Sequence, residues 1–385
     1  MKNLKDIDLS QLIPADATAH ENWILQISSE MLALWQKDFL ELGSLPSQYK
    51  LRKLSKDFII LEFNQSVSPA QLQKTIFPRW LSPIEHQWPV NPTTEGFVEK
   101  ASQGLMRRFS GRCQEIDVFA TTVRLKSVAK GLKGRLHQVF SQNSQTKGSP
   151  TNSKTATQSN GILSVVIDEK GLFAGISLSR LQTGTALVGG LGFLSMQNSP
   201  ANKLDAHSED SHSTGTTRRQ MTSRAGGKIK EVLSLLKEIA IDAQTYPRWI
   251  ELGASPGGMT QQLIHWGAHV TAVDLAELVP ELKQHPKVVH LKIHAQEIST
   301  AEGFEALLSD MNGPFENAAR IVSRIAQTLP SGGLVIHILK LNNSPNPRNA
   351  LNSVMEQFTK HNLTVVTVKH LFHNRQEFTL ICRRN

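Results

Sequence analysis

A glycine-rich loop that follows an apolar segment is the strongest chemical signal in the sequence. It reads Glu251-Leu-Gly-Ala-Ser-Pro-Gly-Gly-Met-Thr and leads into an apolar, helix-forming segment. Glycines at these positions let the backbone turn tightly and approach a ligand at the carboxyl end of a strand. The Gly-x-x-x-Gly-Gly spacing differs from the Gly-x-Gly-x-x-Gly spacing that cradles a pyrophosphate. A dehydrogenase is therefore disfavoured.

An acid at the end of the next apolar segment completes this pattern. Asp274 follows the loop by about 20 residues, where a carboxylate accepts hydrogen bonds from ribose hydroxyls. Together, the loop and the acid predict a site for a nucleoside without a pyrophosphate, which points to S-adenosylmethionine. The predicted cofactor contacts in this part of the chain are Gly253, Ser255, Pro256, Gly257, Gly258 and Asp274.

The residues of the loop and Asp274 must be positioned by the surrounding secondary structure. From Ser223 onward, helical segments alternate with apolar strands, and this alternation predicts a βαβ sheet. The predicted parallel strands cover residues 248–251, 270–274, 288–291, 306–310 and 334–340. Two more strands, 364–368 and 377–382, are joined by a short loop, so we expect them to pair antiparallel. The predicted fold is α/β: a doubly wound, Rossmann-like, mostly parallel sheet whose last strand is antiparallel, preceded by an α+β region.

The glycine-rich loop resembles the first motif of the heat-shock (FtsJ-type) RNA 2′-O-ribose methyltransferases. That family pairs the motif with a Lys–Asp–Lys–Glu tetrad, which Lys228, Asp310, Lys340 and Glu377 match here. The resemblance implies a Rossmann-like methyltransferase that uses S-adenosylmethionine. It also implies cofactor contacts at Asp310 and at His294, which stands where the family has an acid. A second departure is Ala225, in place of a serine.

Members of this family that carry a THUMP RNA-binding module resemble the chain over nearly its whole length. The resemblance implies an N-terminal α+β (ferredoxin-like) domain at 1–94, a THUMP-like RNA-binding domain at 95–200, a linker at 201–220 and an FtsJ-type methyltransferase domain at 221–385. The implied substrate is a cytidine ribose in large-subunit (23S) rRNA. Two alternatives stay open: the same reaction on tRNA or another rRNA site, and a non-catalytic RNA-binding protein that keeps the fold.

The tetrad residues suit methyl transfer to a ribose hydroxyl. A 2′-hydroxyl is a poor nucleophile until its proton is removed, and a sulfonium methyl donor needs only an in-line approach and a base. A lysine is a base when partial burial and a second cation lower its pKa. We expect Lys340 to be the base and Lys228 to supply the second charge, while Asp310 and Glu377 orient the two lysines.

A strongly basic segment lies at residues 101–150. It holds nine basic and two acidic residues, an excess of seven out of the formal net charge of +9. Apolar residues at helical spacing in 125–139 predict a helix with a basic face, and the polar segment 141–160 is expected to be a loop. The predicted contacts to RNA phosphates are Arg124, Lys126, Lys130, Lys133 and Arg135.

The rest of the first 200 residues gives coarser predictions. We expect a helical stretch near 20–42, a strand at 57–63 and a hairpin formed by 162–168 and 172–177. Trp80 and Trp88 are interpreted as core or interface anchors, and His370 and His373, near the end of the chain, as surface residues.

Composition and cysteine usage exclude several classes of protein. The chain has 385 residues, of which 39% are hydrophobic and 19% are charged. This length and composition indicate two or three domains with a sizeable core. Two cysteines exclude a disulfide scaffold and a Cys-rich zinc module. The sequence lacks an apolar run of roughly 18 residues and a signal-peptide core at its start, which predicts a cytoplasmic protein that does not contact membranes. The sequence does not indicate an oligomeric state.

Histidines at 285, 290 and 294 do not predict a metal site. The alternation around residues 288–293 indicates a strand. Four residues of a strand span about 13 Å, which is too far for His290 and His294 to share an ion. We therefore expect no metal.

Overall fold

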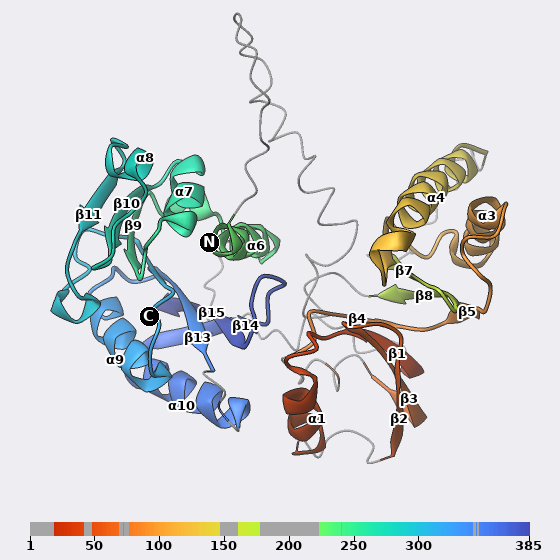
Figure 1. Ribbon diagram of the computed structural model, residues 1–385, viewed down its shortest axis with the longest axis horizontal. Helices are drawn as coiled ribbons and strands as arrows, with labels where there is room; N and C mark the ends of the chain where they lie inside the picture. Colours follow the sequence, from red (N-terminus) through yellow and green to blue (C-terminus); the bar gives the residue numbers. More distant parts are fainter. Residues whose placement is uncertain are drawn as a thin grey trace, which may run out of the picture. The chain divides into compact units, whose positions relative to one another are not determined.

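The computed structural model describes residues 19–41, 48–68, 72, 77–146, 161–177, 223–239, 241–341, 344 and 346–385. The chain divides into two compact units, residues 1–32 with 39–213 and residues 33–38 with 214–385 (Figure 1). The predicted linker at 201–220 lies outside the described residues. The predicted domain boundaries stay predictions.

The first sheet has the strand order β2-β3-β1-β4. Its strands are β1 (His20–Gln26), β2 (Tyr49–Lys53), β3 (Phe58–Val67) and β4 (Trp80–Pro83). The predicted strand at 57–63 is confirmed as part of β3. The predicted helical stretch near 20–42 is wrong in its first part, because β1 precedes helix α1 (Leu32–Glu41). The apolar run of β1, Trp23 to Leu25, is buried and pairs with a strand on each side.

A second sheet has the order β5-β8-β7-β6. Its strands are β5 (His86–Trp88), β6 (Glu115–Ala120), β7 (Ile162–Asp168) and β8 (Gly171–Ser177). The antiparallel β7–β8 pair confirms the predicted hairpin. Helices α3 (Phe97–Phe109) and α4 (Lys126–Thr146) pack their apolar residues against β6 and β7. Trp80 lies 4.6 Å from Phe119 and Trp88 lies 5.5 Å from Phe97, measured between ring centroids, which confirms both tryptophans as anchors.

The basic helix is longer than the sequence predicted. A 3₁₀ turn at Val123–Leu125 leads into α4, which begins at Lys126 and ends at Thr146. The expectation of a loop from residue 141 is therefore wrong for 141–146. Ser141 Oγ donates to the carbonyl of His137 one turn earlier at 2.7 Å, so a polar side chain here bonds within the helix.

The C-terminal sheet has seven strands in the order β11-β10-β9-β12-β13-β15-β14. They are β9 (Arg248–Leu252), β10 (His269–Val273), β11 (Val288–Leu291), β12 (Ala306–Ser309), β13 (Leu334–Lys340), β14 (Leu363–Lys369) and β15 (Glu377–Arg384). The predicted strands and the reversed last strand are confirmed, because β15 runs antiparallel to β13 and to β14. The strand order places β15 between its two partners.

Helices cover both faces of this sheet. They are α6 (Arg224–Glu238), α7 (Gly258–His265), α8 (Pro280–Lys283), α9 (Phe315–Ala326) and α10 (Pro347–Lys360). Helices α9 and α10 lie on one face, and α6 and α7 lie on the other (Figure 1). Chain order reverses at β9, between β10 and β12, which is the switch point where doubly wound sheets bind ligands. None of the described helices is long and apolar enough to cross a membrane.

Candidate active site

Four predicted charged residues meet at the carboxyl edge of β12 and β13. Lys228 lies in α6, Asp310 follows β12, and Lys340 ends β13. Glu377 begins β15, and the antiparallel register sets it directly opposite Lys340. Residues separated by up to 149 positions in the sequence therefore come together because β12 and β13 end, and β15 and α6 begin, at the same edge of the sheet.

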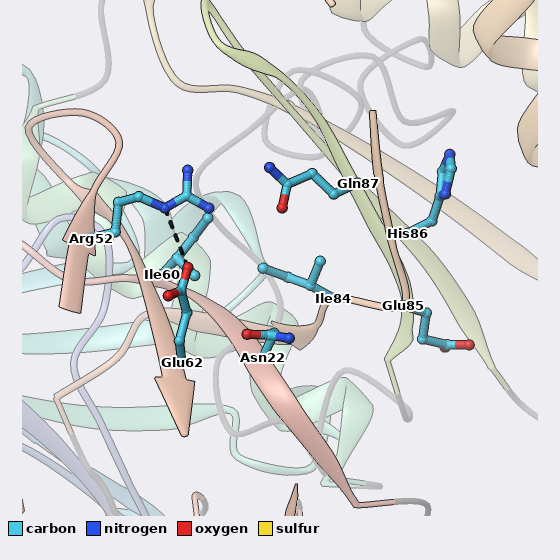
Figure 2. Close-up of a pocket in the computed structure, with 8 residues that line it drawn as sticks. All are labelled: Asn22, Arg52, Ile60, Glu62, Ile84, Glu85, His86 and Gln87. Atoms are coloured by element: carbon cyan, nitrogen blue, oxygen red, sulfur yellow. Dashed lines mark ion pairs between the residues drawn. The ribbon is translucent and has the colours of Figure 1, made fainter. Parts of the chain in front are cut away.

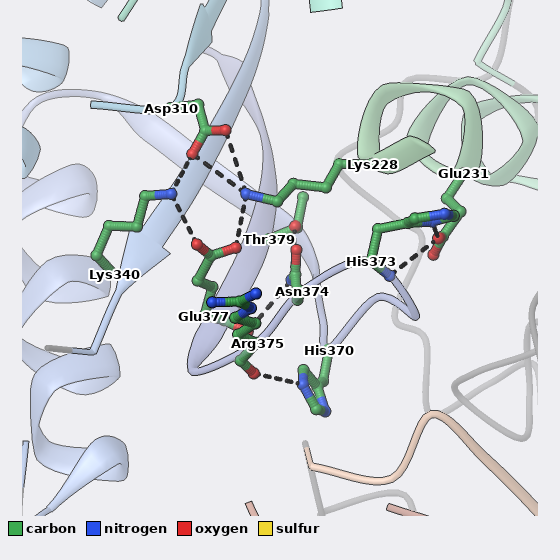
Figure 3. A network of polar contacts seen from close by, with 10 residues as sticks. All are labelled: Lys228, Glu231, Asp310, Lys340, His370, His373, Asn374, Arg375, Glu377 and Thr379. Atoms are coloured by element: carbon green, nitrogen blue, oxygen red, sulfur yellow. Dashed lines mark hydrogen bonds and ion pairs between the residues drawn. The ribbon is translucent and has the colours of Figure 1, made fainter. Parts of the chain in front are cut away.

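The four side chains form a ring of alternating charge (Figure 3). Lys228 Nζ lies 2.6 Å from Glu377 Oε2 and 3.2 Å from Asp310 Oδ2. Lys340 Nζ lies 2.7 Å from Glu377 Oε1 and also pairs with Asp310. The side chains are 5% to 15% exposed, so each charge depends on its neighbours for compensation.

Charge compensation sets the protonation of the ring. Burial lowers the pKa of Lys340, but attraction to Asp310 and Glu377 and hydrogen bonds to both outweigh burial and raise it above its ordinary value. Burial raises the pKa of Glu377, but the two lysines outweigh this effect and lower it. The expectation that burial and a second cation bring the pKa of Lys340 below its ordinary value is therefore wrong, because each lysine lies beside two carboxylates.

The glycine-rich loop lies against the tetrad. Gly253 has φ +81°, and a Cβ there would lie 2.9 Å from the carbonyl oxygen of Asp310. Gly257, at φ +110°, caps α7, and a Cβ on Gly258 would overlap Ser223 Oγ at the start of α6. The loop backbone thus packs directly against the segments that carry Asp310 and Lys228, and a side chain at any of these positions would move it.

Asp274 anchors the loop to the end of β10. Its Oδ2 accepts the backbone N–H of Ser255, and its Oδ1 accepts that of Ala276, both at 2.9 Å. Pro256 O accepts the N–H of Val279 at 3.1 Å. A carboxylate has further acceptor capacity on both oxygens, so Asp274 can hold the loop and still accept ribose hydroxyls. These residues fit the nucleoside part of S-adenosylmethionine.

His294 lies on the exposed surface and caps a 3₁₀ turn at Ala295–Glu297. Its backbone N–H donates to Glu297 Oε1 at 2.8 Å. Its contact with the cofactor stays a prediction. His290 belongs to strand β11 and bonds through Nε2 to the carbonyl of Asp274 at 3.1 Å. Among the described residues, no group of three His, Cys, Asp or Glu side chains could hold a metal ion.

Sequence reasoning missed two buried carboxylates near the tetrad. Glu251 accepts a hydrogen bond from Thr260 Oγ1 at 2.7 Å, and its burial raises its pKa to about 8. Glu231 lies three residues after Lys228, on the same side of α6. This spacing could have been found from the sequence if residues 224–238 had been predicted as a helix.

The surface interpretation of His370 is wrong, because this residue is 2% exposed and bonds to the carbonyl of Arg375.

The predicted RNA contacts, on α4 and on the 3₁₀ turn that precedes it, fall into two groups. Arg124, Lys126 and Lys130 are exposed. Lys133 Nζ pairs with the buried Asp117 at 3.2 Å, and Arg135 pairs with Glu99 at 2.7 Å. Two of the five predicted side chains therefore already bind carboxylates of the protein.

The N-terminal unit also contains a polar cavity of about 330 Å³ (Figure 2). Asn22, Arg52, Glu62 and Gln87 line it, and Arg52 pairs with Glu62 at 3.5 Å. None of the residues predicted to bind RNA or cofactor lines this cavity.

Comparison with known proteins agrees with the fold of the C-terminal unit. Residues 221–371 match the model of the family described as FtsJ-like methyltransferase. The relatives named ribosomal RNA large subunit methyltransferase M include proteins from Xylella fastidiosa (strain 9a5c) and Aromatoleum aromaticum. Each is 30% identical over 169 residues, which is 42% of this chain and 47% or 45% of the relative. The matched part thus spans about half the length of these relatives.

Solved structures with a detectable likeness include two fibrillarins. The Methanococcus jannaschii pre-rRNA processing protein is 16% identical with a TM-score of 0.32, and the likeness covers 36% of this chain and 66% of that one. Aeropyrum pernix fibrillarin, with natively bound S-adenosyl-L-methionine, is 19% identical with a TM-score of 0.31, covering 40% and 74%.

Proposed function

We propose that this chain, whose residues 221–371 match the FtsJ-like methyltransferase family, is an S-adenosylmethionine-dependent RNA 2′-O-ribose methyltransferase. The proposed substrate is a cytidine ribose of large-subunit rRNA, and action on ribosomal RNA would locate the protein in the cytoplasm. The ring formed by Lys228, Asp310, Lys340 and Glu377 beside the glycine-rich loop is the observation that carries the proposal.

The loop and Asp274 would hold the nucleoside of the cofactor. S-adenosylmethionine, when bound, supplies a methyl group on a sulfonium. Gly253 at the start of this loop lies against the backbone of Asp310, so a cofactor held on the loop would lie next to the tetrad. The side chains Ser255 and Asp274 bring polar groups to the same edge of the sheet, and His294 and Asp310 are the further contacts that we propose.

Lys340 would accept the proton of the 2′-hydroxyl. The raised pKa of Lys340 means that its amine is an ammonium in the resting ring, held by Asp310 and Glu377. A positive charge brought near Lys340 lowers its pKa, so binding of a sulfonium favours the neutral amine that can act as a base. Lys228 would keep the two carboxylates fixed while the charge on Lys340 changes.

The N-terminal unit would supply RNA affinity. The exposed residues Lys126 and Lys130 on α4 and Arg124 in the turn before it are available for phosphate contacts, which depend on charge and carry no sequence information. We propose that residues 95–200 act as a THUMP-like RNA-binding domain, consistent with the exposed basic residues of that segment.

Labelled methyl transfer tests the function directly. The full chain is incubated with S-adenosylmethionine carrying a labelled methyl group and with ribosomal particles or tRNA from cells that lack this gene. We expect label on the 2′-oxygen of one large-subunit rRNA nucleotide, and none with Lys340→Ala. Label on tRNA alone would move the substrate and keep the reaction. RNA binding without label on any of these RNAs would contradict the proposal.

A further inference from the structure

A buried carboxylate on α6 holds the loop that precedes Glu377. Glu231 is 3% exposed, and its Oε2 accepts the backbone N–H of Phe372 at 2.9 Å. Its Oε1 accepts the backbone N–H of His373 at 3.2 Å and also pairs with Nδ1 of that histidine (Figure 3). One side chain of α6 therefore binds three donors of the β14–β15 loop, which comprises residues 370–376.

A glycine lets this loop approach the helix. The His373 ring lies so close to Gly227 that a Cβ at position 227 would overlap its Cδ2, Nε2 and Cε1 atoms. Gly227 directly precedes the tetrad residue Lys228, and Glu231 follows Lys228 by three residues, so the loop contacts α6 on both sides of this lysine. The ring cannot move aside freely, because Glu231 holds its Nδ1.

The other end of the same loop is fixed next to Glu377. Asn374 is 1% exposed, and its Nδ2 donates to the carbonyl of Glu377 at 3.2 Å and to Thr379 Oγ1 at 3.1 Å. His370 bonds to the carbonyl of Arg375 at 2.9 Å and so closes the loop on itself. The loop thus links the helix that carries Lys228 to the first residue of β15.

We propose that Glu231, His373 and Asn374 are positioning residues that set the distance between Lys228 and Glu377 and thereby align Lys340 for proton transfer. This inference rests on the proposed methyl transfer. The contacts made by Glu231 lie one helical turn from Lys228, and Asn374 bonds to the backbone of Glu377. The contacts therefore lie on both sides of the 2.6 Å ion pair between Lys228 and Glu377. A misplacement of about 1 Å of a reacting group costs on the order of 10²-fold in rate.

Glu231→Gln tests the inference at constant volume. An amide keeps one acceptor oxygen and turns the other into a donor that faces N–H groups. We expect kcat for methyl transfer to fall on the order of 10- to 10²-fold, while the Kd for S-adenosylmethionine stays within about twofold. Glu305→Gln is the matched control, because Glu305 also binds a backbone N–H and a side chain, those of Arg248, at the opposite edge of the sheet.

The Glu305→Gln variant is expected to lose stability and to keep kcat. Equal kcat losses in both variants, or an unchanged kcat in Glu231→Gln, would overturn the inference. A loss of cofactor affinity in Glu231→Gln that matches its loss of rate would do so as well, because it would indicate general disruption of the domain.

A second pair of variants tests the close approach at Gly227. Gly227→Ala should lower kcat, since its methyl group displaces the His373 ring. Gly227→Ala combined with His373→Ala should be no slower than His373→Ala alone, because the clash is gone. A double variant in which the two losses simply multiply would contradict the proposed contact.

Hydrogen exchange separates failure of the inference from failure of the proposed function. In Glu231→Gln, the amides of Phe372 and His373 should exchange faster than in the wild type, while those of β9 stay unchanged. This result does not depend on activity. Wild-type protein that methylates no RNA would overturn the proposed function, and unchanged exchange at residues 372 and 373 would overturn the inference.

Discussion

The two clusters of charge that the sequence singled out differ in how the protein compensates them. In the tetrad, two lysines and two carboxylates alternate at ion-pair distance, with side chains 5% to 15% exposed. On α4, Lys126 and Lys130 face solvent, while Lys133 and Arg135 pair with carboxylates of the protein. Buried charges must be matched within the structure, whereas exposed charges stay free to meet the charges of a partner.

This difference predicts two kinds of mutational response. A change in the tetrad removes a compensating charge, so it should alter the geometry and protonation of the remaining three residues. A change on the exposed part of α4 should leave the fold untouched and alter only the electrostatic attraction to RNA.

The largest effect is expected for Lys340. Lys340→Arg keeps the positive charge and the pairing with Asp310 and Glu377, but a guanidinium does not lose its proton at a workable pH. Methyl transfer should therefore fall about 10²- to 10⁴-fold, as when a general base is removed, while affinity for S-adenosylmethionine stays near that of the wild type. Single-turnover rates and calorimetry measure the two quantities. Near-normal turnover in Lys340→Arg would refute the assignment of the base.

The pH dependence of that rate reports on the rest of the ring. The raised pKa of Lys340 predicts a wild-type rate that rises with pH, because the neutral amine forms as pH approaches this pKa. Lys228→Ala removes the second cation and leaves both carboxylates beside Lys340, so the pKa of Lys340 should rise further and the profile should shift to higher pH. A profile that stays in place or shifts to lower pH would show that Lys228 does not tune the base.

A smaller effect is expected at the partly buried Asp274. Asp274→Asn keeps the volume but loses the charge, and one of the two oxygens that accept the N–H groups of Ser255 and Ala276 becomes a donor. The affinity for S-adenosylmethionine should drop by about 1–3 kcal/mol, the range for a hydrogen bond to a charged group. Calorimetry with S-adenosylmethionine and with NAD checks this. Equal affinity of the wild type for the two ligands would remove the basis for the cofactor assignment.

The parallel part of the fold was predictable because its signals are local. Each of the five parallel strands is a short apolar run, and the loop after β9 has glycines at positions that require φ > 0, Gly253 and Gly257. The insertion of β15 between β13 and β14 has no such local signal, because it depends on pairing between segments distant in the sequence. The helix predicted near residue 20 failed for the same reason: β1 is a strand because β3 and β4 flank it.

The membership of the tetrad could be inferred from the sequence, but its electrostatics could not. Resemblance supplied the four residues, and strand ends explain why they share an edge of the sheet. The direction of the pKa shift of Lys340 depends on the distances to Asp310 and Glu377, which only the folded chain defines. Likewise, the pairing of Lys133 with Asp117 joins a helix to a strand, and no spacing rule within α4 reveals it.

Helix α4 allows the effect of its exposed lysines on RNA binding to be compared with that of a lysine paired to a carboxylate of the protein. Lys126→Ala and Lys130→Ala should each weaken RNA binding and reduce the slope of log K against log salt concentration by up to about 0.7–0.9, the contribution of one phosphate contact. Lys133→Ala should change the slope less and lower stability more, because it breaks the pair with the buried Asp117. Filter binding over a salt series and thermal melting give both readouts. Equal slopes in all three variants would remove the distinction.

The smallest effect on activity is expected for Glu251. This carboxyl is buried, and it takes part in none of the ion pairs found among the described residues. Burial raises its pKa to about 8, so the folded state holds a proton that the unfolded chain releases near the ordinary carboxyl pKa. The stability from this group is present at low pH and is lost as pH rises through about 8. In urea unfolding, the free energy of unfolding of Glu251→Gln, which mimics the protonated form, should therefore fall less than that of the wild type between pH 6 and pH 9.

Glu277→Gln is the control. Hydrogen bonds to Lys283 and Lys292 lower the pKa of Glu277 to about 2, so this carboxylate does not titrate in the same range. A Glu251→Gln variant that loses stability with pH as steeply as the wild type would mean that this carboxylate is ionised and compensated in the folded protein, as those of the tetrad are.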